Sequence, residues 1–113
     1  MKAVNHRSDR VLADDLVLAD TLLRRMWGLL GRKVLACGEG LWIRPCGGVH
    51  TFGMRFPIDV VFLDRQLCVI AVTHSLPPNR LTRIQVNAAS ILELPPGTAE
   101  HTATLTGDLI RIE

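Results

Sequence analysis

Residues Gly40 to Asp64 read GLWIRPCGGVHTFGMRFPIDVVFLD. An apolar run at each end of this stretch predicts a buried strand, over residues 40–44 and 59–64. The connection between them carries a thiol, an imidazole, a hydroxyl, a thioether and charged groups. Such groups commonly lie on loops that a rigid scaffold positions. We therefore expect the functional site on the segment Cys46–Asp59.

Further short strands are expected on both sides of this stretch. Apolar runs separated by turn residues occur at residues 49–54, 67–75, 91–94 and 109–112, and residues 11–19 read as an extended segment that pairs with residues 3–5. The break at Asp64-Arg65-Gln66 suits a tight hairpin, although it lacks the usual glycine or asparagine. Many short strands with turn signals predict a mostly β domain, as a small antiparallel β barrel or a sandwich.

One helix is predicted, over about residues 21–30. Apolar residues at helical spacing mark it: Leu22, Leu23, Met26, Trp27 and Leu30. Asp20 is placed to cap its start, and Gly31 is placed to end it in a left-handed conformation. The apolar face of this helix should pack against the sheet, which gives an α+β fold dominated by strands.

Length and composition are those of an ordinary globular chain. The 113 residues are the length of one domain, and 48% of them are hydrophobic and 21% charged. This apolar content is sufficient for a core. We expect a single domain over residues 1–113 that folds alone, as a monomer or a weak homo-oligomer.

The same figures exclude several classes of partner. The formal net charge is only +2 and the basic residues are interspersed with acidic ones, so nucleic acid is not a predicted partner. The longest uniformly apolar run, Leu67 to Val72, is far shorter than the ~20 residues of a membrane-spanning helix. Residues 1–9 are polar and lack the apolar region of a secretory signal. We therefore expect a cytoplasmic protein without membrane association.

The cysteines are predicted to be free thiols. The chain has an odd number of cysteines, Cys37, Cys46 and Cys68, and none of them form a CxxC pair. Neither a disulfide framework nor a structural zinc site is therefore expected. No metal or other cofactor is predicted.

Short blocks of sequence occur in a distinctive order along the chain. They are GLLGR at 28–32, EG at 39–40, HTFGMRFPIDVVF at 50–62, LEL at 92–94 followed by Gly97, and GD at 107–108. In this order the blocks resemble the DUF192 family of domains of unknown function, over nearly the whole chain from about Leu22 onward. The resemblance implies a compact, largely β fold of about this length and no agreed biochemical activity.

Cys46, His50 and Asp59 are the candidate catalytic residues. Cys46 and His50 are four residues apart with two glycines between them, and a thiol beside an imidazole can become a nucleophile when a carboxylate orients the ring. The alternative is that Cys46 is a small buried residue and His50 a strand-edge residue bonded to backbone. A metal site would have too few ligands at a recognised spacing.

Two carboxylates are expected to need partners. Asp59 follows Pro57, whose fixed backbone aims the carboxylate. Glu93 lies on an apolar strand, where a lone carboxylate is costly to bury. We predict that at least one ion pair joins these acids to Arg44 or Arg55, which end neighbouring strands.

The predicted ligand-binding residues are Arg44, His50, Thr51, Met54, Arg55, Asp59 and Glu93. Met54 could line an apolar groove together with Phe52, Phe56 and Trp42, although core packing is the more usual role of such side chains.

The sequence therefore predicts a non-catalytic module, binding or accessory in role, that takes a small ligand or peptide on the loop Cys46–Asp59. One alternative is a small hydrolase or thiol-dependent enzyme that uses Cys46 and His50. Another is a structural or assembly protein whose interface is an exposed apolar patch. Convergence of Cys46, His50 and an acid in one pocket would favour the enzyme, whereas a concave surface with a few polar anchors would favour the binding module.

Overall fold

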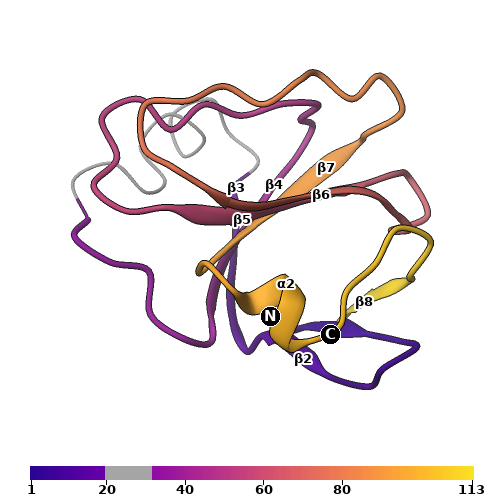
Figure 1. Ribbon diagram of the computed structural model, residues 1–113. Helices are drawn as coiled ribbons and strands as arrows, with labels where there is room; N and C mark the ends of the chain where they lie inside the picture. Colours follow the sequence, from indigo (N-terminus) through magenta and orange to yellow (C-terminus); the bar gives the residue numbers. More distant parts are fainter. Residues whose placement is uncertain (20–31) are drawn as a thin grey trace.

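The protein folds as two β-sheets with a short helix beside them (Figure 1). The computed structural model describes residues 1–19 and 32–113. Its strands are β1 (Ala3–Asn5), β2 (Val11–Ala13), β3 (Asp15–Ala19), β4 (Glu39–Ile43), β5 (Ile58–Leu63), β6 (Val69–Leu76), β7 (Ser90–Leu94) and β8 (Ile110–Ile112), and its helix is α2 (Thr98–His101).

The larger sheet has five strands in the order β3-β4-β7-β5-β6. β3 and β4 run parallel, and every other neighbouring pair is antiparallel. The central strand β7 begins at Ser90, which pairs with Leu63 at the end of β5, and its next residue, Ile91, pairs with Ile43 at the end of β4. The loops that leave β4 and β5 and the loop that enters β7 therefore meet at one end of the sheet.

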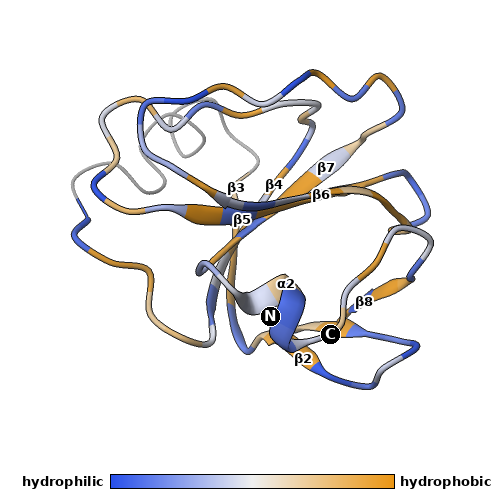
Figure 2. Ribbon diagram, in the orientation of Figure 1, coloured by the Kyte–Doolittle hydropathy of each residue, from blue (hydrophilic) through white to orange (hydrophobic). Residues whose placement is uncertain are grey.

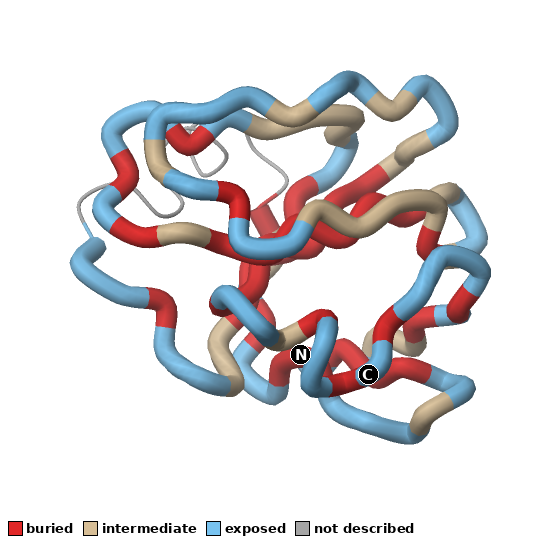
Figure 3. Tube along the Cα trace, viewed as in Figure 1, coloured by how far each residue is buried: buried red, intermediate tan, exposed pale blue. Residues whose placement is uncertain are grey.

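Side chains alternate between the two faces of this sheet and form two cores. One face carries Leu41, Ile43, Val60, Phe62 and Ile91, which pack with Leu35, Met54 and Phe56 in what we call the loop-side core. The other face carries Trp42, Val61, Leu63, Leu92 and Leu94, which pack with Leu12, Ala13 and Ile110 in what we call the sheet-side core. Figure 2 shows hydrophobic residues along the middle of β5 and β7, and Figure 3 shows the same strands buried.

The smaller sheet has the order β2-β1-β8 and covers the sheet-side core. A polar network ties it together, in which Arg7 Nε donates to Asp108 Oδ1 at 2.7 Å and Asn5 Nδ2 donates to Asp108 Oδ2 at 2.9 Å. The hydrogen bond from Arg7, aided by that from Asn5, holds the pKa of Asp108 well below its usual range. This network connects the N-terminal hairpin to the turn before β8.

The predicted fold class, α+β with mostly β structure, is confirmed, and the two sheets form a sandwich-like arrangement rather than a closed barrel. The prediction of a strand over residues 49–54 is wrong. That segment is a loop with one isolated bridge, from His50 to Leu81. A short helix, α2, spans Thr98–His101. The helix predicted over residues 21–30 lies outside the described residues.

In the part of the chain that the structure describes, no helix is both long enough and apolar enough to cross a membrane.

Candidate ligand-binding site

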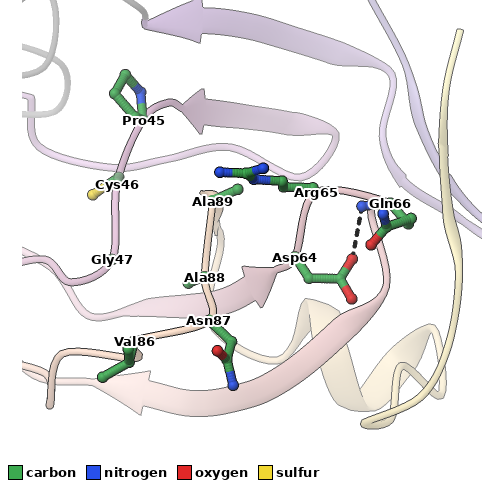
Figure 4. A pocket seen from close by; sticks show the side chains of 10 residues that line it. All are labelled: Pro45, Cys46, Gly47, Asp64, Arg65, Gln66, Val86, Asn87, Ala88 and Ala89. Carbon is green, nitrogen blue, oxygen red and sulfur yellow. Dashed lines mark hydrogen bonds between the residues drawn. The ribbon is translucent and has the colours of Figure 1, made fainter.

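The loops that meet at the end of the five-stranded sheet enclose an open cavity of about 820 Å³ (Figure 4). They are residues 45–47 after β4, residues 64–66 after β5 and residues 86–89 before β7. Two backbone hydrogen bonds join them: Cys46 N–H donates to the Ala89 carbonyl at 3.1 Å, and Ala89 N–H donates to the Leu63 carbonyl at 2.8 Å. The volume lies in the range of small-molecule sites.

The β5–β6 turn positions the two charged residues that line this cavity, Asp64 and Arg65. Asp64 Oδ1 accepts hydrogen bonds from the N–H groups of Gln66 and Cys68, both at 2.9 Å. Leu67 takes the left-handed conformation, with φ 64°, which glycine or asparagine usually supplies in such turns. The carboxylate of Asp64 thus stabilises a turn whose sequence lacks the customary residue.

Figure 4 shows that the two charged side chains point in different directions. The guanidinium of Arg65 extends toward Ala89 and the Pro45–Cys46 side of the cavity, whereas the Asp64 carboxylate turns toward Gln66. Arg65 makes no salt bridge with any carboxylate of residues 1–19 or 32–113. The cation therefore faces the cavity and the anion is held by the turn.

Cys46 and His50 do not form a pair. The half-buried Cys46 packs against the loop-side core, and its Sγ donates to the Gly48 carbonyl at 3.0 Å. His50 is exposed, and its ring stacks on Phe52 with 5.5 Å between centroids. Within the described residues no hydrogen bond joins the thiol to the imidazole.

Asp59 lies on the opposite face of the sheet from the loop-side core. It is fully buried, its Oδ1 accepts a hydrogen bond from Ser75 N–H at 2.8 Å, and its Oδ2 accepts one from Ala99 N–H at 2.9 Å. Cys46 packs on the other face. The structure therefore does not bring Asp59 together with the thiol, and backbone N–H groups of β6 and α2 take the place of the predicted arginine.

Glu93 is buried in the middle of the sheet. It pairs across the strands with Leu41 and Val60, both of which belong to the loop-side core. Burial raises the pKa of Glu93 to about 7.

The predicted arginine ion pair is wrong. The salt bridges of residues 1–19 and 32–113 involve neither Arg44 nor Arg55. Both arginines are exposed, and Arg44 lies over the ring of Trp42, 4.5 Å from its centroid.

Thr51 holds the site loop in place. It is fully buried, and its Oγ1 donates to the Pro77 carbonyl at 2.6 Å and accepts from Arg80 N–H at 2.9 Å. Met54 is buried in the loop-side core, whereas Phe52 is 48% exposed. The buried side chains of Thr51 and Met54 therefore stabilise the conformation of the loop, and other residues form the exposed surface of the loop.

The cavity itself involves residues that sequence reasoning missed. Residues 64–66 were identified only as a turn, and residues 86–89 carried no recognised pattern. The signal that would have found them is the strand order, because β7 lies between β4 and β5 and brings their loops together. Among the described residues, no group of three or more His, Cys, Asp or Glu is placed to hold a metal ion.

The family model of DUF192, described as Uncharacterized ACR, matches residues 3–112. The chain belongs to this family. A UPF0127 protein of Pyrococcus horikoshii is 32% identical to this DUF192 protein in an alignment of 111 residues, with 96% of each chain covered.

Solved structures share the fold of this DUF192 protein. A protein of unknown function from Novosphingobium aromaticivorans has a TM-score of 0.85 and 20% identity, with 99% of this chain and 84% of that chain covered. A protein from Sinorhizobium meliloti, named as a candidate transcription regulator, has a TM-score of 0.79 and 21% identity, with 97% and 89% covered. At these identities the likeness concerns the fold alone.

Proposed function

We propose that this DUF192 protein is a non-catalytic binding or accessory module that takes a small ligand at the start of the loop Cys46–Asp59. The observation that carries the proposal is the cavity at the end of the five-stranded sheet, whose wall includes Cys46. Cavities of this volume are typical of small-molecule sites. A cytoplasmic location and a monomeric or weakly homo-oligomeric state are parts of the same proposal.

The positions of the candidate catalytic residues favour binding over catalysis. A thiol nucleophile requires a base within hydrogen-bond reach and a third group that orients the base. Here Cys46 donates to a carbonyl, His50 stacks on a phenyl ring and Asp59 accepts from backbone N–H groups. Each of these groups has a structural partner of its own.

Ligand binding should protect Cys46 from alkylation. The full chain is treated with iodoacetamide, with and without a mixture of small charged and neutral fragments, and the labelling of each cysteine is followed by mass spectrometry. Fragments in the cavity should slow the labelling of Cys46, because its wall would be covered. Cys37 is exposed and does not line the cavity, so its labelling should not change.

Equal labelling of Cys46 with and without every fragment would contradict the binding proposal. Labelling of Cys46 that is much faster than that of Cys37, and that falls when His50 is replaced by Gln, would support the thiol-enzyme alternative instead.

A further inference from the structure

The two charged side chains of the cavity wall differ in what they leave for a ligand. Asp64 Oδ1 accepts two hydrogen bonds, and both come from its own turn, from Gln66 N–H and Cys68 N–H. Arg65 has no carboxylate partner in the described chain, and Figure 4 shows its guanidinium above Ala89, on the cavity side. The guanidinium of Arg65 is therefore available to a ligand in the cavity. The carboxylate of Asp64 is stabilised by its own turn and points toward Gln66.

Arginine is suited to one class of group in particular. Its planar fork of N–H donors matches the two oxygens of a carboxylate or a phosphate, and such charge-assisted hydrogen bonds are stronger than neutral ones. The side-chain amides of Gln66 and Asn87 also line the cavity and can donate further hydrogen bonds.

Apolar side chains form the smaller part of the cavity wall. Pro45, Val86, Ala88 and Ala89 line the cavity between the polar groups. Apolar surface of this kind favours the carbon skeleton of a ligand. The cavity thus combines a cationic anchor and a mostly polar wall with a smaller apolar surface.

We propose that the cavity binds a small organic oxyanion, a carboxylate or a phosphate monoester, with Arg65 as the residue that holds the charged group. This inference rests on the proposed binding function and specifies the chemical class of the ligand. The apolar part of the ligand contacts the wall formed by Pro45, Val86, Ala88 and Ala89.

Matched aromatic probes test the requirement for charge. The ¹⁵N-labelled full chain is titrated with benzoate, phenyl phosphate and the neutral benzamide, and amide shifts are followed by NMR. Benzoate or phenyl phosphate should shift the amides of residues 64–66 and 86–89, with an affinity at least about tenfold higher than that of benzamide. The tighter of the two anions identifies the source of the oxyanion as carboxylate or phosphate.

Two arginine variants separate a specific contact from the loss of net charge. Arg65→Gln should weaken binding of the preferred anion about tenfold and leave benzamide unaffected. Arg83→Gln removes the same charge from an exposed loop residue that does not line the cavity, and it should leave both affinities within about twofold. Amide shifts far from residue 65 report whether each variant retains its fold.

Equal affinity for benzamide and the anions, or equal weakening by the Arg65 and Arg83 variants, would overturn the oxyanion inference while the binding function stands. If none of the probes shifts amides at the cavity and no fragment protects Cys46, both proposals fail together.

Discussion

Replacing Asp59 with alanine should lower the free energy of unfolding by about 4 kcal/mol. The carboxylate is fully buried and accepts hydrogen bonds from Ser75 N–H and Ala99 N–H. Leaving the buried Ala99 N–H without an acceptor costs about 1–3 kcal/mol, and losing the part-buried hydrogen bond from the exposed residue Ser75 adds about 1 kcal/mol. The substitution removes both acceptors at once, and the small alanine side chain leaves a void beside them.

Asp59 also has a specific role at the start of α2. The N-cap residue of this helix is Gly97, which makes no side-chain capping bond. The Ala99 N–H, near the start of α2, is instead satisfied by Asp59 from strand β5. We therefore expect the loss of Asp59 to loosen α2 from the sheet.

A matched variant is available for this test. Asp64→Ala removes the same number of carboxylate hydrogen bonds to backbone N–H groups, but from a half-exposed turn that water can reach. It should cost about 1 kcal/mol. Urea unfolding followed by circular dichroism measures both losses, and equal losses in the two variants would show that burial of Asp59 does not set the cost.

Glu93 should make stability fall as the pH rises. Burial raises its pKa from 4.5 to about 7 in the folded chain, so between these values the folded state keeps a proton that the unfolded state has lost. The contribution of Glu93 to the free energy of unfolding is therefore greatest below about pH 4.5. It decreases as the pH rises, until the pH passes the folded pKa near 7. A shift of this size corresponds to about 3 kcal/mol over the whole window.

The Glu93→Gln variant isolates this effect. Glutamine keeps the shape of the side chain but does not ionise, so the difference in unfolding free energy between wild type and variant should move by about 3 kcal/mol in favour of the variant from pH 4.5 to 8. Glu100→Gln removes a carboxylate at an exposed position and controls for net charge. A difference between wild type and Glu93→Gln that does not change with pH would contradict the buried, protonated state.

Local sequence patterns predicted the strands of the large sheet well. The apolar runs placed strands at 59–64 and 91–94, and the structure has β5 at Ile58–Leu63 and β7 at Ser90–Leu94. Residues 49–54 have similar composition, but Thr51 bonds to Pro77 and Arg80. Those contacts lie 26 and 29 positions away in sequence and hold the segment as a loop, which a local pattern cannot indicate.

The candidate site was only partly accessible to sequence reasoning. The apolar context of Glu93 indicated that its side chain points among apolar residues, but the choice of arginine partners assumed neighbours that the strand order does not provide. β7 is flanked by Leu41 and Val60 at that position. The cavity depends on the same strand order, since Arg65 and Ala89 meet only because β5 and β7 are neighbours.

The most direct test of the binding function is a crystal structure of the full chain soaked with the fragment mixture. We predict electron density for a fragment in the cavity between Cys46, Arg65 and Ala89. Fragments bound only elsewhere, for example on the exposed side chains of Phe52 and Leu81, with the cavity holding solvent alone, would contradict the account.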